Sequence, residues 1–551
     1  MNNKELANLI FPDITKTIED YEKIYPVRNL NEGAVVSRFA PSPTGFVHMG
    51  SLLSALIASK VPKETNGIFY LRIEDTDGKR SVENGIQGII DDLKNFEINI
   101  DEGVVSETKQ IGNYGPYIQS ERKEIYQTFV KYLIANDLAY PCFCTEEETN
   151  EIRTIQEAAK ERIGYYGHWA KCRNLSNEER SNRIKNGDKY IIRLKSPGNF
   201  NNKVVIEDLV RGRIEFPEND LDIVLIKSDG LPLYHLAHLV DDHLMRTTHI
   251  LRGEEWVSSL PVHLQLFKIF NFKTPKYAHL GVIMKIDDDQ TRRKLSKRKD
   301  PEAAVSYYHE KGIPVEAVKI YLMTIANSNF EAWYNANPNK TIDDFTFSFK
   351  KMSESGSLFD VDKLMNISKN YISKLKAIEV YERTIKWAKF YDQQLEQLLI
   401  KYQDYSIKIF NIEREQKKPR KDFGAFCEIK SGIWYMYDEL FINVDYQFQT
   451  ISDINEINKI NQLYLSKYYN ELDDKETWFS KMRLVAFELG YAKEMSDYKE
   501  NPDKYKGHIG DVSMVIRVSL TSLSATPDLY EIMKLLGKER INQRLNIIKV
   551  K

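Results

Sequence analysis

A histidine that follows a proline-rich turn is the first residue of this chain suited to chemistry. Residues 38–51 have the sequence R-F-A-P-S-P-T-G-F-V-H-M-G-S, in which two prolines and Gly45 disfavour regular structure. A short β-type run precedes the turn, and an apolar stretch typical of a buried helix face follows it. This order predicts that His48 and Gly50 lie at a helix N-terminus, where free backbone N–H groups and the helix dipole attract anions.

A basic segment far downstream is the second chemical signal. Residues 292–299 have the sequence R-R-K-L-S-K-R-K, with six cations in eight positions. Such a density of positive charge needs a polyanion or solvent as its partner. Alone, a histidine is usually a surface residue and a charge run is usually a solvated face. Together, the two segments predict a triphosphate held between a helix start and a mobile basic loop.

Three of the four cysteines fall in one short stretch. Cys142 and Cys144 form a C-x-C pair, and Cys172 follows with His168 four residues before it. Thiolates and imidazoles are the ligands that tetrahedral zinc prefers. We therefore predict a structural zinc bound by Cys142, Cys144, His168 and Cys172. The alternative is a set of reduced, partly buried cysteines.

Length and composition limit the class of protein. A chain of 551 residues is long enough for several domains, and 29% charged with 42% hydrophobic residues is ordinary for a globular protein. The net charge of −2 gives no overall attraction for nucleic acid, so an RNA site must be a local basic patch. We find no disulfide framework, no signal peptide and no apolar run long enough to span a membrane. We expect a cytoplasmic protein without membrane contact.

The order of expected elements separates an α/β part from a helical part. A strand at 68–73 and an amphipathic stretch at 85–95 are typical of an open parallel sheet. Residues 116–230 have the pattern of an insertion. From about residue 311 onward almost everything is predicted to be helical. The short strands expected in the insertion are Tyr190–Leu194, Val204–Leu209 and Ile223–Ile226.

The same segments resemble signatures of a known enzyme family. H-M-G-S at 48–51 resembles the H-I-G-H signature of class I aminoacyl-tRNA synthetases, and K-L-S-K-R at 294–298 resembles their K-M-S-K-S signature. The leading R-F-A-P-S-P-T-G, with R-I-E-D-T-D at 72–77 and L-R-G-E-E-W at 251–256, narrows the resemblance to bacterial-type glutamyl-tRNA synthetases. The resemblance leaves out residues 1–33, where we predict only an amphipathic surface helix.

The resemblance implies a fold and a set of domains. The fold is α/β, with a class I Rossmann-like parallel sheet, an inserted acceptor-binding domain and an all-α C-terminal anticodon-binding region. The pattern alone supports only an α/β part followed by an α part. The predicted boundaries are 1–33 for an N-terminal extension, 34–115 and 231–310 for the two halves of the catalytic domain, 116–230 for the insertion, 311–375 for a helical stem-contact region and 376–551 for the anticodon-binding domain.

The resemblance also implies a reaction. Such an enzyme, expected as a monomer, activates L-glutamate with ATP and Mg²⁺ to glutamyl-adenylate and transfers glutamate to the 3′ end of tRNA(Glu). Positioning and cations supply most of the stabilisation, so no side-chain nucleophile is required. The predicted catalytic residues are His48 and Lys297. The residues predicted to bind ATP are His48, Gly50, Ser51, Lys294, Lys297 and Arg298, and those predicted to bind glutamate are Arg38, Ala40, Ser42, Glu74, Tyr234, His238 and Arg252.

Charge assigns roles within the predicted glutamate site. Arg38 suits the γ-carboxylate because a planar guanidinium can bind a carboxylate through two hydrogen bonds. Glu74 suits the α-ammonium. Arg252 also suits a carboxylate, and its alternative role is a salt bridge with Glu254 or Glu255.

Several positions are open to two interpretations. Ser51 stands where many class I enzymes have a second histidine, and His238 stands where relatives often carry asparagine. Trp256 either stacks near the adenine or the tRNA end, or packs in the core. Arg517 is a candidate for anticodon contact, with helix packing as its alternative. K-M-S-E-S at 351–355 imitates the downstream signature, but a glutamate replaces the phosphate-binding lysine, so we interpret it as an ordinary turn.

Four other functions compete with glutamate–tRNA ligation. A glutaminyl-tRNA synthetase usually has P-E-P-N-G where this chain has P-S-P-T-G, and its anticodon domains are β-barrels. A paralogue that glutamylates a modified tRNA base, of the glutamyl-queuosine type, lacks an anticodon-binding tail. A small adenylyl-transferring nucleotidyltransferase would be shorter. A non-catalytic tRNA-binding module would not need His48 and Lys297.

Overall fold

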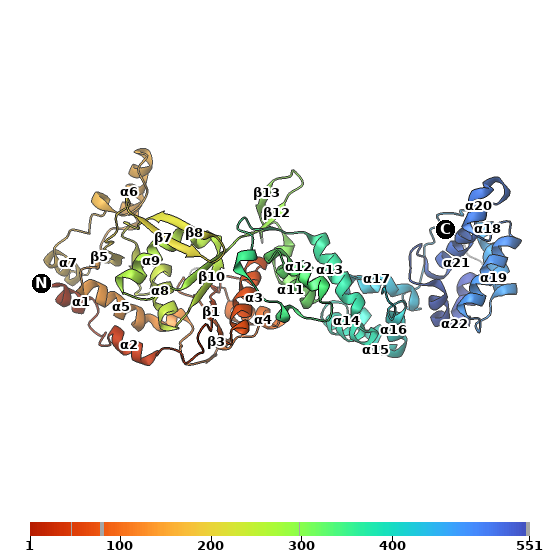
Figure 1. Cartoon of the computed structure of the whole chain (residues 1–551), viewed down its shortest axis with the longest axis horizontal. Helices are drawn as coiled ribbons and strands as arrows, with labels where there is room; N and C mark the ends of the chain where they lie inside the picture. Colours follow the sequence, from red (N-terminus) through yellow and green to blue (C-terminus); the bar gives the residue numbers. More distant parts are fainter. Residues whose placement is uncertain (46, 78–81, 297, 547–551) are drawn as a thin grey trace. The chain divides into compact units, whose positions relative to one another are not determined.

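The computed structural model describes residues 1–45, 47–77, 82–296 and 298–546 (Figure 1). The chain divides into two compact units. The first comprises Met1–Tyr307 with Lys319–Asp360, and the second comprises Tyr308–Val318 with Val361–Lys551. None of the helices within the described ranges is long and apolar enough to cross a membrane.

Parallel strands form the sheet at the centre of the first unit. β1 (Val36–Phe39), β2 (Ile68–Leu71) and β3 (Glu102–Ser106) are parallel, and β4 (Lys109–Ile111) closes this edge in the antiparallel direction. β10 (His249–Gly253) pairs in parallel with β11 (Lys276–Leu280). β10 packs beside β1, and the Thr248 N–H just before it donates to the Val36 carbonyl at 2.9 Å. The expected parallel sheet is therefore present.

Apolar helices cover this sheet. α3 (Met49–Glu64) follows β1 and packs on β1, β2 and β10, and most of its residues are buried. In a parallel sheet, strands that are buried on both faces need helices packed against those faces. Further helices and strands of the first unit are α4 (Gly85–Asn95), α5 (Lys123–Ala135), α8 (Tyr234–Leu244), α9 (Leu260–Ile269), α12 (Phe330–Ala336), β12 (Ile283–Ile286), β13 (Arg292–Lys294) and β14 (Ser357–Leu358).

The insertion contains a small antiparallel sheet and a hairpin. β5 (Ala139–Cys142), β6 (Ile191–Leu194) and β9 (Val224–Ile226) form the sheet. β7 (Lys203–Asp208) and β8 (Gly212–Pro217) form the hairpin. The three strands expected here from the sequence are confirmed to within two residues. The helices of the insertion are α6 (Glu146–Ala158), α7 (Asn177–Lys185) and the short 3₁₀ turn η2 (Gly167–Trp169).

The second unit is helical, as expected. Its core is made of buried aliphatic and aromatic side chains, including Val380, Leu395 and Val512. α10 (Ser306–Lys311) and α11 (Val315–Ala326) contain points at which the chain passes between units. The remaining helices are α13 (Val361–Lys374), α14 (Ala377–Tyr391), α15 (Gln393–Lys401), α16 (Gln403–Asn411), α17 (Ile429–Ile433), α18 (Ile454–Leu463), α19 (Lys475–Glu488), α20 (Met495–Glu500), α21 (Ile509–Thr521) and α22 (Leu529–Leu545).

The N-terminal segment forms two short helices instead of the single helix expected. α1 (Asn3–Ile10) and α2 (Ile18–Ile24) each begin with a reciprocal capping box, which satisfies the free N–H groups of a short helix. Both helices pack on α5. Beyond them, the half-buried Arg28 forms two hydrogen bonds with Glu102 at 2.7 and 2.9 Å, and its guanidinium lies 3.7 Å from the Tyr114 ring centroid. A half-buried ion pair therefore joins this segment to β3 of the sheet.

Arg28→Ala should lower the free energy of unfolding of the first unit by about 2 kcal/mol, because it leaves the half-buried Glu102 carboxylate with the Tyr117 hydroxyl but without its charged partner. Urea-induced unfolding followed by circular dichroism measures this change. Lys16→Ala is the matched control, since Lys16 forms an exposed ion pair with Glu124 in the same segment. That control should lose less than about 1 kcal/mol. Equal midpoints for the two variants would contradict a special role for Arg28.

Candidate functional site

A polar cavity of about 710 Å³ opens at the carboxyl ends of β1 and β10. These two strands lie side by side, and the sheet extends from β1 toward β2 on one side and from β10 toward β11 on the other. Ligands of open α/β sheets bind at such a switch point. The predicted residues that line the cavity are Arg38, Ala40, Ser42, His48, Gly50, Ser51, Glu74, Tyr234, Arg252 and Lys294.

Two predicted residues, Arg298 and His238, do not line this cavity, and a third cannot be placed. Lys297 lies outside the described residues. Arg298 is exposed and is not a lining residue. His238 is fully buried behind the cavity wall, and its Nε2 lies 3.0 Å from the Tyr277 hydroxyl.

His48 is the N-cap of α3, as the sequence predicted. The Ser51 N–H donates to His48 Nδ1 at 3.1 Å, and His48 Nε2 lies 2.9 Å from the Ser51 hydroxyl. Since Nδ1 accepts a hydrogen bond, the neutral ring carries its hydrogen on Nε2 and donates it to Ser51. A Cβ on Gly50 would lie 3.2 Å from two ring atoms. Ser51 and Gly50 thus fix the orientation of the imidazole at the cavity.

The basic loop is anchored mainly by the buried carboxylate of Asp300, and Arg293 also donates to Asp287 at 2.6 Å. Arg293 donates to Asp300 at 2.6 and 2.8 Å, and the Ser296 N–H donates to Asp300 at 2.8 Å. The hydrogen bonds from Arg293 hold the pKa of Asp300 well below its usual range. Arg293 is therefore a structural cation. Lys294 lines the cavity, and its Nζ lies 3.8 Å from Glu255.

Arg38 already has a carboxylate partner inside the protein. Its Nε and Nη2 donate to Asp242 at 3.1 and 3.3 Å, and its Nη1 donates to the Leu251 carbonyl at 3.2 Å. Asp242 also accepts from Arg72 at 2.8 Å. Burial alone would raise the pKa of Asp242, but Arg38 and Arg72 outweigh it and lower this pKa to about 2. Three of the five N–H groups of Arg38 are thus occupied, and two remain.

Arg252 is surrounded by neutral acceptors. It donates to the Tyr234 hydroxyl at 2.9 Å, to His279 Nε2 at 2.9 Å and to the Trp256 carbonyl at 3.2 Å. The alternative salt bridge is wrong for Glu254, which pairs with Arg211 instead. Among the described residues, the structure gives Arg252 no ion pair with any carboxylate. Arg252 therefore offers the cavity a positive charge that the described protein does not neutralise.

Two further lining residues complete the polar wall. Glu74 accepts from Arg72 at 3.0 Å, and burial raises its pKa despite this partner. Trp256 lines the cavity with its ring centroid 4.3 Å from that of Tyr234, and it is 38% exposed. Trp256 is therefore a wall residue and is not packed in the core.

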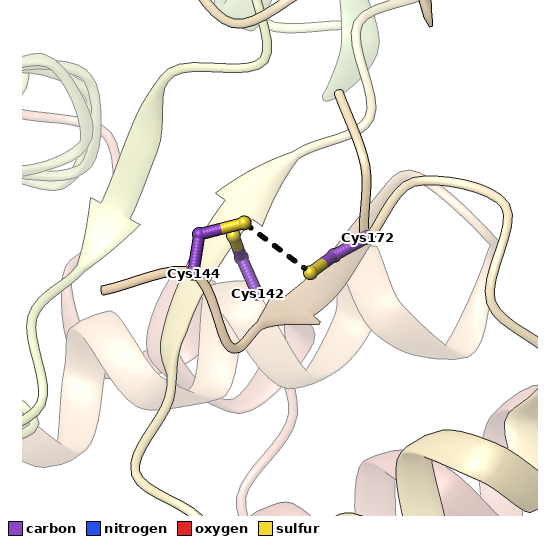
Figure 2. Close-up of side chains that lie close together, drawn as sticks. All are labelled: Cys142, Cys144 and Cys172. Carbon is purple, nitrogen blue, oxygen red and sulfur yellow. Dashed lines mark hydrogen bonds between the residues drawn. The ribbon is translucent and has the colours of Figure 1, made fainter. Parts of the chain in front are cut away.

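The three clustered cysteines come together in the insertion (Figure 2). The sulfur atoms of Cys142, Cys144 and Cys172 lie within 4.8 Å of one another, and the last two are 3.7 Å apart. Hydrogen bonding to Cys144 and Cys172 lowers the pKa of the Cys142 thiol and so favours a thiolate. Such a group could hold a metal ion.

The structure does not place the predicted fourth ligand, His168, in this group of sulfur atoms. His168 lies on the 3₁₀ turn η2, is exposed, and stacks on Trp169 with ring centroids 4.5 Å apart. The turn carries its imidazole away from the sulfur atoms. The Tyr165 hydroxyl takes that place, 3.4 Å from Cys142 Sγ and 3.2 Å from Cys144 Sγ. Sequence spacing could have suggested Tyr165, since it lies three residues before His168 in the same Tyr-rich run.

The structure bears on two other interpretations of the sequence. Arg517 donates to the Thr526 and Pro527 carbonyls at 3.3 and 2.9 Å, so it holds the loop between α21 and α22, and its anticodon contact stays a prediction. The imitation of the downstream signature at 351–355 follows a 3₁₀ turn that ends at Lys351 and does not line the cavity. Its interpretation as an ordinary turn is confirmed.

Comparison with known proteins gives consistent results. Residues 34–366 match the family of class I tRNA synthetases (E and Q), catalytic domain, and residues 497–549 match an anticodon binding domain. The chain is 48% identical over 548 residues to a glutamate–tRNA ligase of Clostridium perfringens, covering 99% of this chain and 100% of the relative. It is 48% identical over 547 residues to that of Acetivibrio thermocellus, covering 99% of both.

Solved structures agree with the sequence relatives. A crystal structure of a glutamate–tRNA ligase from Elizabethkingia meningosepticum, in complex with its amino acid, has a TM-score of 0.73 and 25% identity. The match covers 93% of this chain and 98% of the other. A glutamate–tRNA synthetase structure from Elizabethkingia anophelis matches with the same values.

Asp300→Asn should expose the basic loop to trypsin. The loss of charge-assisted bonds worth roughly 1.5–3 kcal/mol should raise cleavage within residues 292–299 by about 10-fold or more. Mass spectrometry of timed digests locates and counts the cuts. Asp288→Asn is the matched control, because it removes a charge from the same loop without touching Asp300. Equal cleavage in both variants would show that Asp300 does not anchor the loop.

Proposed function

The chain belongs to the glutamate–tRNA ligases, class I tRNA synthetases of the E and Q type, and from this premise we propose how its own residues carry the reaction. The enzyme activates L-glutamate with ATP, releasing pyrophosphate, and transfers the glutamyl group from glutamyl-adenylate to the 3′ end of tRNA(Glu). The observation that supports these roles best is a single cavity that carries His48, Glu74, Arg252 and Lys294 on its wall.

ATP is placed at the α3 end of this cavity. The N-terminus of α3, with Gly50 and Ser51, faces the phosphates, and His48 turns its Nε2–H from Ser51 to a phosphate oxygen. Lys294 lines the same cavity, and Lys297 and Arg298 follow it in the sequence. Cations in these positions stabilise the charge that develops when the carboxylate attacks the α-phosphate. Among the described residues no cluster of carboxylates has metal-ligand spacing, so Mg²⁺ enters with the ATP phosphates.

Glutamate is placed between two arginines and one carboxylate. The remaining N–H groups of Arg38 bind the γ-carboxylate, with Ala40 and Ser42 beside it. Glu74 accepts from the α-ammonium, and Arg252, together with Tyr234, faces the α-carboxylate. His238 supports Tyr234 from behind, since their ring centroids are 5.6 Å apart.

The two ends of the tRNA are assigned to different parts of the chain. We infer that the insertion at 116–230 contacts the acceptor end, and that the helical region from 376 onward contacts the anticodon. The match of residues 497–549 to an anticodon binding domain supports the second assignment.

Lys297→Ala tests the proposed chemistry. It should lower kcat of glutamate-dependent ATP–pyrophosphate exchange by about 10²-fold or more, equivalent to about 2.7 kcal/mol of transition-state stabilisation, with a smaller change in the KM for ATP. Exchange is measured with glutamate or glutamine, and with or without tRNA(Glu). Lys351→Ala is the matched control, because it alters the imitation of the signature and should leave both constants unchanged.

Two outcomes would contradict this account. Exchange that depends on glutamine and not on glutamate would overturn the proposed function itself. A large rise in the KM for ATP at unchanged kcat would leave the function in place but would show that Lys297 acts in ground-state binding.

The three-cysteine cluster is proposed to hold a structural zinc ion. The three sulfur atoms lie within 4.8 Å of one another, and zinc prefers thiolate ligands gathered in this way. Cys142, Cys144 and Cys172 would be the ligands, with the Tyr165 hydroxyl as the nearest further donor. A zinc at this place would cross-link β5 to the loop before α7 and so stabilise the insertion.

Elemental analysis of the purified protein tests the zinc proposal. The wild type should contain about one zinc per chain, and Cys172→Ser should lose it, because two thiolates bind zinc far more weakly than three. His168→Ala is the control and should keep its zinc. Tyr165→Phe should keep zinc at saturation but release it faster to a chelator. A wild type without zinc refutes the site, and zinc loss in His168→Ala would restore the original ligand set.

A further inference from the structure

We propose that Asp208 and His279 are positioning residues for Arg252, and that they hold its guanidinium toward the amino-acid end of the cavity. This inference rests on the proposed role of Arg252 in binding glutamate. Neither residue lines the cavity, and neither was singled out by the sequence.

The sheet places Arg252 and His279 side by side. Arg252 on β10 and His279 on β11 are direct partners in the parallel register, so their side chains project from the same face. Arg252 Nε donates to His279 Nε2 at 2.9 Å, and both residues are buried. This contact fixes the Nε edge of the guanidinium, which leaves the two Nη atoms to face Tyr234 and the cavity.

The guanidinium dictates which hydrogen His279 carries. Arginine can only donate, so His279 Nε2 must be the unprotonated nitrogen. The ring hydrogen is then on Nδ1, which lies 2.6 Å from Asp208 Oδ2 and donates to it. Which nitrogen of a histidine is protonated is set by the hydrogen bond that the other makes. Asp208 therefore holds His279 in the only neutral form that can accept from Arg252.

A histidine nitrogen also has to accept a hydrogen bond on the other side of the Arg252 guanidinium. Its Nη1 lies 3.3 Å from His263 Nδ1, which must also accept, and His263 Nε2 lies 3.0 Å from His235 Nδ1. Burial lowers the pKa of His263 well below its usual range, and burial with Arg252 lowers that of His235 to about 4. Both rings are therefore neutral near pH 7. Arg252 is thus oriented from two sides without its charge being neutralised, which leaves that charge for a substrate carboxylate.

Asp208 itself is fixed by the hairpin of the insertion. Its Oδ1 accepts from the backbone N–H groups of Val210 and Arg211 at 3.0 Å each, and from the His279 N–H at 3.3 Å. Asp208 is the last residue of β7, so the turn of the β7–β8 hairpin supplies two of these donors. The orientation of a cavity arginine therefore depends on the conformation of a hairpin that belongs to the insertion.

This arrangement makes the effect of Asp208→Asn specific. The amide oxygen of the asparagine must stay with the three backbone N–H groups, so its NH₂ group faces His279 Nδ1. Nδ1 then has to accept, and the ring hydrogen moves to Nε2, where it meets the Arg252 Nε–H. Two donors face each other, and Arg252 has to turn away. Asp208→Asn thus removes one charge with almost no change of shape, and it moves the ring hydrogen of His279 from Nδ1 to Nε2.

The experiment compares Asp208→Asn with the wild type in ATP–pyrophosphate exchange. The KM for glutamate should rise about 10-fold or more, while the KM for ATP changes less than about twofold. Two substitutions of His279 separate the effect of its hydrogen-bond acceptor from the effect of its size. His279→Gln keeps an acceptor for Arg252 and should retain most glutamate affinity, whereas His279→Met, with a side chain of the same length, should lose it. ¹⁵N spectra of histidine-labelled protein should show the His279 hydrogen on Nδ1 in the wild type and on Nε2 in Asp208→Asn.

The outcomes separate this inference from the proposed function. A wild type without glutamate-dependent exchange would overturn the proposed function. A normal wild type, with unchanged glutamate KM in Asp208→Asn or equal effects of Gln and Met at position 279, would overturn the positioning role alone. An equal rise in both KM values would indicate a general structural effect and would also overturn it. If Asp208→Asn fails to fold, as judged by its melting temperature, the Gln and Met pair decides.

Discussion

The catalytic half of this protein depends on two adjacent carboxylates in α8 that are fully buried. Asp242 binds Arg38 and Arg72, and Asp241 accepts from Arg122 at 2.7 Å. The arginines come from chain segments before or at the start of the insertion, and the carboxylates come from the segment after it. Removing one member of such a buried pair typically costs 3–5 kcal/mol, because the other is left uncompensated. These ion pairs therefore join the two halves of the sheet across the insertion.

The same pairs prepare the cavity electrostatically. Charge compensation by Asp242 allows Arg38 to be buried and still present two N–H groups. Arg252, by contrast, is held by the hydroxyl of Tyr234, a backbone carbonyl and neutral imidazoles, so its charge is left over. Free glutamate carries two carboxylates and one ammonium group, a net charge of −1. Arg252 is an arginine of the cavity wall whose charge is not compensated by a carboxylate of the described residues. Its charge therefore complements the net charge of −1 on glutamate.

The sequence predicted those features of the site that depend only on residues close together in the chain. The prolines, Gly45 and the apolar stretch behind His48 were sufficient to place that histidine at a helix start. Partners far away in sequence could not be foreseen: Arg38 and Asp242 are 204 residues apart, and nothing in either neighbourhood indicates the other. The fourth position at the cysteine cluster was missed for a smaller reason. A short 3₁₀ turn decides whether Tyr165 or His168 faces the sulfur atoms, and spacing alone does not show the direction of a side chain.

The separation of Arg38 from Asp242 also has a consequence during synthesis. A ribosome adds roughly 5–20 residues per second, so about 10–40 s pass between the emergence of the arginine and that of its carboxylate. During that interval the arginines of the first strands, which are buried in the folded protein, have no carboxylates to compensate their charge. The core around these strands therefore cannot form. The nascent chain must therefore wait with an open sheet edge until α8 has left the exit tunnel. Chaperone binding and proteolytic sensitivity should be greatest for nascent chains whose α8 has not yet left the tunnel.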